Sequence, residues 1–495
     1  MQDARPDTRP ESTPRLPSRS IPFSKDDWQY SFYKKLENVV AKRKRRETPR
    51  IIVITDIEQD YDDLLAIIFL AEMHRMGAVE LAGFIANHEP ADRRAKFLRT
   101  VLHLLQLPNV PVAVGTVGTD DRAKHVHDHF YALKNETFEN ASWNKKGFKS
   151  GKDLIEELAD PRRPLTMLLI SSLQDMAEFF TARYKETGHE ATSKYLQQRF
   201  TKFVSQGGYK IAPNRVDLIP VKGMMNNDYN FPKAENYCNG LVSFNLRSDA
   251  WSREAAKAAR LEGSFMQRLF KYGPIGAHLR WSWLRQEFKF FWDPMNWPFM
   301  PHLKVDWYLN TRLGLEKNSP KFNHLKEKSE TLGLGFEEVA EDVKVIAYDC
   351  CAAVGVVGDD FMREFGVLEN RNVGQHRIFG ESSDDLGGIN PKKLSEVMQA
   401  FLLGGLKSTY DAANQMGGFQ TLKHNPKASP YNARDFLSKI LPLMKKMEEY
   451  KNRNEEGKAR QIESKLRDIV GKVPTRDDIP YEQLYQEVVQ RQRRK

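Results

Sequence analysis

Residues 50–63 read Arg-Ile-Ile-Val-Ile-Thr-Asp-Ile-Glu-Gln-Asp-Tyr-Asp-Asp. The β-branched run 51–54 is typical of a buried strand, and the apolar segment 64–73 predicts a helix. Between them stand five carboxylates within eight residues: Asp56, Glu58, Asp60, Asp62 and Asp63. In an open α/β sheet, ligands bind beyond the carboxyl ends of the strands. The stretch therefore predicts a strand, an acidic turn and a helix, with a binding site at the turn.

Two interpretations of the acidic turn are open on these residues alone. Carboxylates packed this closely repel one another unless a cation neutralises them. A set of oxygen ligands favours a hard cation, calcium or magnesium, over zinc. In the alternative interpretation the turn is simply solvated, and Asp62 and Asp63 favour the start of the helix.

The rest of the chain alternates apolar strand patterns with helical periodicity. We expect strands at 51–55, 79–86, 110–114, 165–170 and 343–347, and helices at 62–75, 93–107, 153–158 and 173–184. Strands that alternate with helices imply parallel pairing. The predicted fold class is α/β, a Rossmann-like open and mostly parallel sheet with helices on both faces.

The length of 495 residues exceeds one average domain. Composition predicts a disordered basic N-terminal segment (1–49), an α/β domain (50–430) and a charged helical C-terminal tail (431–495). Five tryptophans gather in 281–307, at positions 281, 283, 292, 297 and 307. They are expected either to pack in a core or subunit contact, or to form a lid that stacks an aromatic ligand.

The net charge of +10 belongs to the two ends of the chain. Residues 1–50 hold 13 Lys/Arg against 7 Asp/Glu, and residues 431–495 hold 16 against 11. The core is therefore nearly neutral and is not expected to bind nucleic acid. The run Lys42–Arg46 is similar to a nuclear-import or polyanion-binding cluster, although such runs are more often solvated linkers.

Compartment is predicted from three further observations. The three cysteines, two of them adjacent, offer no disulfide framework, which fits a reducing compartment. The N-terminus lacks the apolar core of a signal peptide. No apolar run approaches the roughly 20 residues that span a bilayer. We expect a cytoplasmic protein that does not enter membranes, with nuclear import as the alternative that Lys42–Arg46 would support.

Four later segments each carry an apolar strand pattern like that of the opening stretch. They are Leu81–Asn87, Val110–Gly115, Thr166–Asp175 and Val345–Ala352. In this order, over roughly residues 50–360, the segments resemble the inosine-uridine-preferring nucleoside hydrolase superfamily. The resemblance implies a calcium-dependent hydrolase that acts on nucleoside-like small molecules, commonly as a homodimer or homotetramer.

The resemblance assigns a metal site residue by residue. Asp63 and Asp349 match metal ligands, and Gln174 matches a residue that ligates through its backbone carbonyl. Glu58 stands where the family has an aspartate that binds calcium and takes a proton from the attacking water. Asp62 matches the acid that touches the metal-bound ribose and water.

Other positions match residues near the substrate. Asn87 falls on the family's asparagine near the ribose, while Asp228 and Asn230 are candidates for holding the sugar hydroxyls. Tyr348 stands where relatives have the histidine that helps protonate the departing base.

The sequence departs from the family pattern at three of these places. Glu58 replaces an aspartate and reaches one methylene farther, Asp60 replaces a glycine and adds negative charge, and Tyr348 replaces the histidine. The segment His125-Val126-His127-Asp128-His129 follows the strand at 110–114. We expect either an exposed, unliganded loop or a transition-metal array. One of its histidines, or a lid tryptophan, would be the substitute for the missing acid.

Three functions can be weighed against these residues. Cleavage of an N-ribosidic bond builds positive charge on the anomeric carbon, which carboxylates and a cation would support. The first function is therefore calcium-dependent hydrolysis of the N-glycosidic bond of a ribonucleoside or a related ribosylated compound. The second is a catalytically weak or inactive relative that binds a ribosyl ligand and acts as an interaction protein. A haloacid-dehalogenase-like phosphatase needs Asp-x-Asp after the first strand, and Asp56-Ile57-Glu58 does not meet that requirement.

Overall fold

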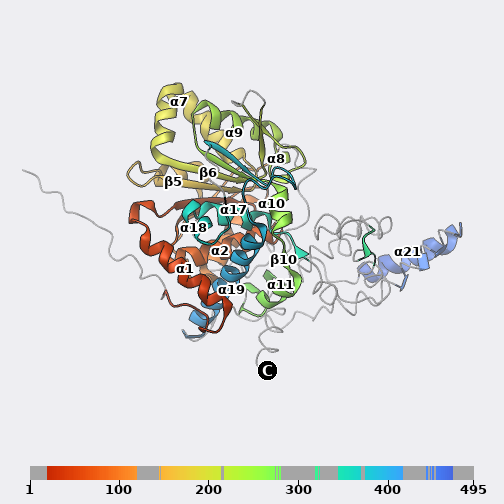
Figure 1. Ribbon diagram of the computed structural model, residues 1–495. Coiled ribbons are helices and arrows are strands. Elements are labelled where there is room, and N and C mark those ends of the chain that lie inside the picture. Colours follow the sequence, from red (N-terminus) through yellow and green to blue (C-terminus); the bar gives the residue numbers. More distant parts are fainter. Residues whose placement is uncertain are drawn as a thin grey trace, which may run out of the picture.

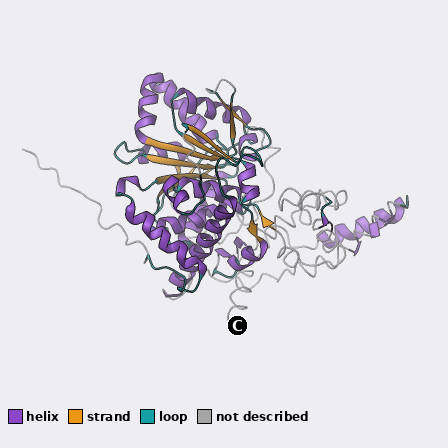
Figure 2. Ribbon diagram, viewed as in Figure 1, coloured by secondary structure: helices purple, strands orange, loops and turns teal. Residues whose placement is uncertain are grey.

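The computed structural model describes residues 19–58, 60–119, 147–212, 217–273, 344–369 and 374–415, with Asn144 and shorter stretches between 275 and 323 and between 442 and 471 (Figures 1 and 2). Its centre is an eight-stranded sheet in the order β12-β9-β6-β5-β1-β2-β3-β4, in which every neighbouring pair is parallel. The strands are β1 (Arg50–Thr55), β2 (Glu80–Ala86), β3 (Val112–Val114), β4 (Lys149–Ser150), β5 (Leu165–Ile170), β6 (Phe200–Gln206), β9 (Ser248–Trp251) and β12 (His376–Phe379).

Helices cover both faces of this sheet (Figure 1). The described helices of the domain are α1 (Trp28–Lys42), α2 (Asp62–Met76), α3 (Ala91–Leu104), α6 (Gly151–Leu158), α7 (Gln174–Arg199), α8 (Met225–Asp228), α9 (Phe231–Ser243), α10 (Arg253–Ala258), α11 (Gly263–Leu269), α17 (Tyr348–Val356), α18 (Asp359–Glu364) and α19 (Pro391–Gln415). Ile51 and Val53 enter one buried cluster, and Ile52 and Ile54 enter the other. Successive side chains of a strand point to opposite faces, so a strand covered on both sides is apolar throughout. The predicted fold class is confirmed.

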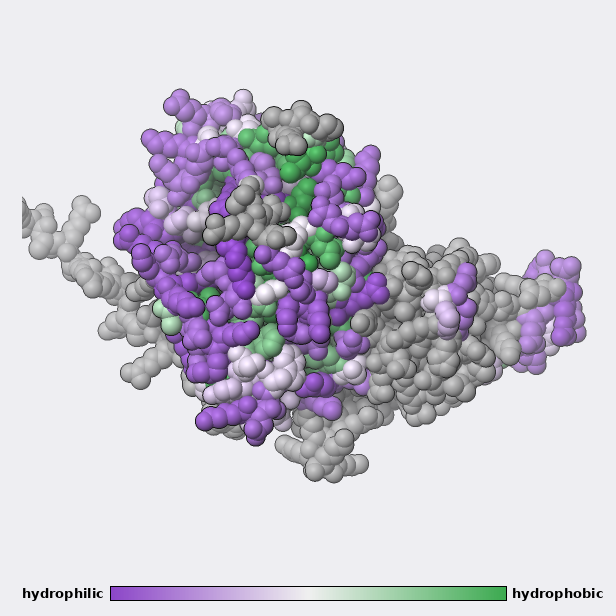
Figure 3. Space-filling view, viewed as in Figure 1, coloured by the Kyte–Doolittle hydropathy of each residue, from purple (hydrophilic) through white to green (hydrophobic). Residues whose placement is uncertain are grey.

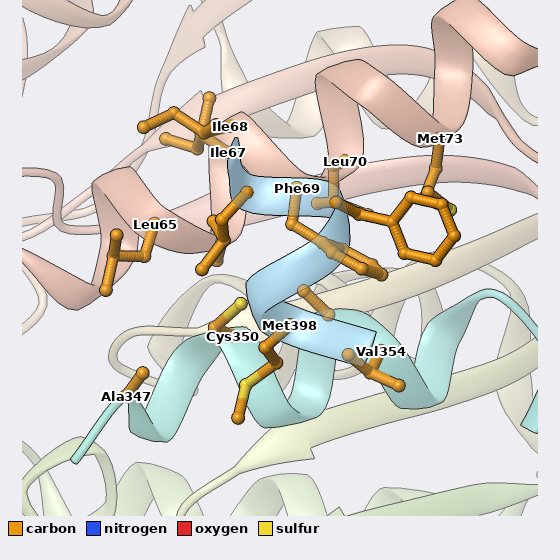
Figure 4. Close-up of a cluster of buried hydrophobic side chains, with 14 of the residues drawn as sticks. Leu65, Ile67, Ile68, Phe69, Leu70, Met73, Ala347, Cys350, Val354 and Met398 are labelled. Atoms are coloured by element: carbon orange, nitrogen blue, oxygen red, sulfur yellow. The ribbon is translucent and has the colours of Figure 1, made fainter. Parts of the chain in front are cut away.

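Helix α2 lies deep in the domain, because it is apolar on nearly all sides. All its residues except His74 are buried, and Gly77 closes it in the left-handed conformation with φ 81°. Figure 4 shows Leu65, Phe69 and Met73 of α2 in one cluster with residues of α17 and with Met398 of α19. This packing fixes the N-terminal ends of α2 and α17, where the predicted site residues begin.

The prediction of disorder for residues 1–49 is wrong for residues 28–42, which form α1. Tyr33, Leu36 and Val39 of this helix are buried in the core. The Tyr33 hydroxyl donates a hydrogen bond to Glu72 of α2, and Arg75 also binds that carboxylate. The helix was missed because the polar composition of the segment masks an apolar stripe at helical spacing.

One residue of the basic run Lys42–Arg46 is bound within the folded domain. Arg43 is bound to the Asp360 carboxylate at 2.6 Å, to the carbonyl of Ala78 at 2.6 Å and to that of Val357 at 2.8 Å. A receptor that reads the run as an extended peptide would have to break these contacts. The cellular location of the protein stays a prediction.

The late strand expected at 343–347 is shorter and lies outside the parallel sheet. Only β11 (Lys344–Val345) is a strand, and it pairs antiparallel with β10 (Leu261–Glu262). The chain then turns at Ala347 into α17, so the segment delivers Asp349 on a helix. A second small sheet joins β7 (Tyr209–Ile211) to β8 (Leu218–Pro220).

On the face seen in Figure 3, the described residues are mostly hydrophilic, with apolar side chains visible between polar ones. Within the described part of the chain, no helix combines the length and the apolar character needed to cross a membrane. In the tail expected at 431–495, residues Glu456–Gly471 form helix α21. The tryptophan-rich region 281–307 and the histidines at 125–129 lie outside the described residues.

Candidate metal centre

The candidate site lies where the course of the chain through the sheet reverses direction. β1 has β2 on one side and β5 on the other, and the later strands extend the sheet beyond β5. Such a switch point opens a crevice at the carboxyl ends of the strands. The acidic turn follows β1, Asn87 follows β2, and residues 171–175 follow β5.

Four aspartates come together at this edge of the sheet. Asp60, Asp62, Asp63 and Asp349 each offer a carboxylate oxygen, and these oxygens all lie within 4.8 Å of one another. Asp60 is half-buried and the other three are buried. Asp63 and Asp349 lie close together, as the sequence led us to expect. Asp60, a carboxylate of the acidic turn that the family resemblance did not assign as a ligand, belongs to the group, and Glu58 does not.

Two helix N-termini support these carboxylates. Asp62 and Asp63 occupy the first turn of α2, and Asp349 occupies the first turn of α17. The backbone N–H of Tyr348, the first residue of α17, donates to Asp62 Oδ2 at 3.1 Å, and the Thr55 hydroxyl donates to Asp63. The positive ends of the helix dipoles favour the ionised acids, but they do not supply a full charge.

The pKa values of the group show how strongly the ionised forms are disfavoured without a cation. Burial, followed by the charges of neighbouring aspartates, raises the pKa of Asp63 and of Asp349 well above the ordinary value. Burial and the nearby Asp60 raise the pKa of Asp56 to about 6, against the opposing effect of Arg94. A divalent cation would relieve this repulsion, and a set of carboxylate oxygens fits calcium or magnesium. The residues present therefore fit a hard metal ion.

Glu58 does not belong to the four-aspartate group, and its carboxylate contacts a residue that sequence reasoning missed. Its carboxylate forms a hydrogen bond with His278 Nε2, and both side chains are buried. The backbone of Glu58 is left-handed, with φ 73°, which is uncommon for a residue with a side chain. The ring of His278 lies against Phe97 at 4.8 Å between centroids. No local motif could have predicted this pair, because 220 residues separate its members.

Asn87 is locked into a buried hydrogen-bond network at the end of β2. Its Nδ2 donates to Asp175 Oδ2 at 2.7 Å and to the carbonyl of Ser172 at 3.0 Å, while Ser171 donates to its Oδ1. Asp175 also accepts from the backbone N–H of Thr116 at 2.9 Å and from its hydroxyl at 2.8 Å. Asp175 stands in the Ser-Ser-Leu-Gln-Asp turn, so its position after a buried strand was the signal that could have revealed it.

The other predicted substrate residues occupy different surroundings. Asn230 is buried and donates to Gln174 Oε1 at 3.2 Å, and Gln174 in turn donates to Glu178 at 2.8 Å. Asp228 is exposed and accepts from the backbone N–H of Gly223 at 2.8 Å. The sugar-binding roles of Asp228 and Asn230, and the metal-binding role of the Gln174 carbonyl, stay predictions.

Tyr229, between these two residues, reaches the acidic turn instead. Its hydroxyl donates to Asp56 Oδ2 at 2.9 Å, and its ring stacks on His88 at 4.4 Å between centroids. Burial and the charge of Asp56 raise the pKa of the Tyr229 hydroxyl, so it stays a hydrogen-bond donor. It thereby links α8 and its flanking loop to the end of β1.

Of the comparisons with known proteins, only the comparison with solved structures finds matches to this chain. No protein-family model matches the chain, and no curated protein does. The type III effector protein XopQ, solved in complex with adenosine diphosphate ribose, matches with a TM-score of 0.57 and 17% identity over 76% of this chain and 98% of that one. The chain has the α/β fold of XopQ. The effector protein XOO4466 gives the same TM-score, identity and coverage.

Nucleoside hydrolases are also among the similar structures. The plant nucleoside hydrolase PpNRh1 matches with a TM-score of 0.42 and 10% identity, over 72% of this chain and 98% of that one. Likeness at these identities concerns the fold, so activity must be argued from the site.

Proposed function

We propose that the protein is a calcium-dependent hydrolase of the N-glycosidic bond of a ribonucleoside or a related ribosylated compound. The observation that carries the proposal is the group Asp60, Asp62, Asp63 and Asp349, buried at the carboxyl edge of the parallel sheet. The family resemblance of the sequence supplies the reaction.

In this proposal Asp60, Asp63 and Asp349 hold the cation, together with the backbone carbonyl of Gln174. A bound cation of this kind fixes ribose hydroxyls and lowers the pKa of a water molecule. Asp62 contacts the ribose and the water. The cation's oxygen ligands are then drawn from three separate segments, which explains why the site needs the folded domain.

Glu58 and His278 form the proton-accepting pair. Glu58 takes a proton from the attacking water, and the hydrogen bond from His278 holds its carboxylate in place. The water oxygen bonds to the anomeric carbon while the bond to the base breaks, and the base leaves with that electron pair and a proton donated by Tyr348. Asn87 faces the sugar from the end of β2, where Asp175 fixes its amide. Asp228 and Asn230 bind sugar hydroxyls.

A second candidate function is the binding of a ribosyl ligand without turnover. One observation favours it, since the Glu58 carboxylate is bound to His278 and lies outside the aspartate group. The XopQ structure is a complex with adenosine diphosphate ribose, which is a ribosylated ligand bound to that protein.

The test is the release of the free base from a panel of nucleosides and from adenosine diphosphate ribose. We expect release in the presence of calcium, loss of release in a chelator and recovery when calcium is returned. Calcium-dependent binding of a ribosyl ligand with no base released from any compound would leave the second candidate. Absence of calcium binding would remove both.

Glu58→Gln should separate proton transfer from metal binding. Because Glu58 lies outside the aspartate group, the variant is expected to bind calcium like the unaltered protein. Hydrolysis is expected to fall on the order of 100-fold or more, the usual contribution of a general base. Calorimetric calcium titration and base release measure the two effects.

Glu381→Gln is the matched control for this variant, because Glu381 is exposed in the loop after β12. It should change neither calcium binding nor hydrolysis. Loss of calcium binding by Glu58→Gln would show that Glu58 is a metal ligand in solution, as the sequence first suggested.

A further inference from the structure

Arg94, on α3, is fully buried beside the acidic turn, and its side chain donates to backbone carbonyls. Its Nη1 donates to the carbonyl of Ile57 at 2.6 Å and to that of Asp56. Its Nε donates to the carbonyl of His88 at 3.1 Å, and Nη2 donates to that of Glu89 at 3.4 Å. One guanidinium therefore contacts carbonyls in two loops.

The two loops are the ones that carry the candidate site. Asp56 and Ile57 follow β1, and His88 and Glu89 follow β2 directly after Asn87. The guanidinium presents five donors in a rigid planar fork, whereas a lysine ammonium is a compact point charge with three donors. Lysine could keep the charge at this place, but it could not hold both loops in the same geometry.

The charge of Arg94 also acts on the acidic residues. Burial lowers the pKa of Arg94, and the charges of Asp56, Asp63 and Glu58 oppose that effect by favouring its charged form. Arg94 in turn opposes the rise in the pKa of Asp56 and Asp63. A permanent positive charge in a buried site is felt strongly, because screening by water is weak there. The same charge must repel a divalent cation that enters the group.

We propose that Arg94 is a positioning residue with two separable effects on the metal centre. Its fork holds the loops after β1 and β2 in the conformation that binds the cation, and its charge offsets part of the carboxylate repulsion when no cation is bound. The inference rests on the proposed metal site. Beyond that site, we infer that the planar fork of Arg94 strengthens cation binding and that its positive charge weakens it.

Two substitutions separate these effects. Arg94→Lys keeps the charge and loses the fork, so the calcium dissociation constant should rise about tenfold, as for other residues that orient metal ligands. Arg94→Gln loses both, and without the repelling charge it should bind calcium at least about threefold more tightly than Arg94→Lys. The rise in melting temperature on adding calcium should also be larger for Arg94→Gln, because the cation replaces the missing positive charge.

The control is Arg93→Gln, which removes a charge from the same turn of α3 at a half-buried position. It should leave the calcium dissociation constant unchanged. If Arg94→Gln does not fold, the double variant D56N/R94Q removes one charge of each sign and should restore folding. Failure of that double variant, together with equal calcium affinities for Arg94→Lys and the unaltered protein, would overturn the inference.

The proposed metal site and this inference fail in different ways. If the unaltered protein shows no calcium-dependent change in melting temperature, the metal site itself is excluded. If the unaltered protein responds to calcium but Arg94→Lys and Arg94→Gln respond identically, the metal site stands and the assignment of Arg94 is wrong.

Discussion

Asp63→Asn is expected to abolish calcium binding and hydrolysis together. Asp63 is buried within the aspartate group, and asparagine keeps its shape and can still accept from Thr55. The substitution therefore removes one negative charge with little change in packing. Because the number of charged ligands largely sets calcium affinity, we expect a loss on the order of 100-fold or more. Calorimetric titration and base release measure it.

The same substitution should have the opposite effect on the metal-free protein. Burial and like charges raise the pKa of Asp63, so its ionised form destabilises the folded state when no cation is bound. In a chelator, Asp63→Asn should melt at a higher temperature than the unaltered protein, and addition of calcium should reverse the order. Asp153→Asn, an exposed acid in the first turn of α6, is the control. Calcium binding that survives Asp63→Asn would exclude the proposed site.

The second large effect is a dependence of stability on pH that calcium inverts. In the metal-free protein the pKa of Asp56 rises from 3.8 to about 6. A raised pKa contributes stability that is fully present below about pH 4 and is lost as pH rises through about 6. For Asp56 alone the loss is about 3 kcal/mol, and Asp63 and Asp349 shift in the same direction.

The acids with lowered pKa values do not change the stability of the protein in this pH range. Asp249 and Asp359 are paired with Arg377, and their pKa values lie below the ordinary one. The stability that they contribute is present above about pH 4 and is lost only at lower pH, so it is constant between about pH 5 and 7. Burial lowers the pKa values of His74, His103 and His376, and these groups raise stability as pH increases through the same window. The difference in stability between the unaltered protein and Asp56→Asn over that window therefore reports the candidate site.

Calcium should reverse the trend, because the cation binds the deprotonated carboxylates. Melting temperatures measured from pH 5 to 7 in a chelator should fall, and those measured in calcium should hold or rise. Asp56→Asn should flatten the fall in the chelator. Parallel curves with and without calcium would contradict a cation site at these acids.

The central part of the fold was predictable because its signals are local. β1 and α2 are mostly apolar and almost entirely buried, and Gly77 marks the end of α2 where its left-handed conformation is required. The edge strand β12 and its neighbour β9 were not predicted, because Asp249 and Arg377 make their sequences look polar. Those two side chains are buried together, bound at 2.6 and 2.7 Å. Pairing across strands cannot be seen in either strand alone.

The candidate site was predictable to the extent that it follows the ends of strands. Asp62, Asp63 and Asp349 were expected from motifs at such ends, and the structure brings them together. The direction of the Glu58 side chain depends on the backbone conformation of one residue and on His278 far along the chain. Arg94 likewise acts through carbonyls of residues that its own sequence neighbourhood does not identify.

Helix α1 has a practical consequence for producing this protein. Its Tyr33 approaches α19 so closely that a β-carbon at Gly404 would lie 1.7 Å from the Tyr33 hydroxyl, and it satisfies the buried Glu72. A recombinant version that starts at residue 50 would remove this cover, exposing apolar surface on α2 and α19 and leaving Glu72 with one partner fewer. Expression clones should therefore begin upstream of residue 19, and an insoluble shorter clone would say nothing about the chemistry of the acidic site.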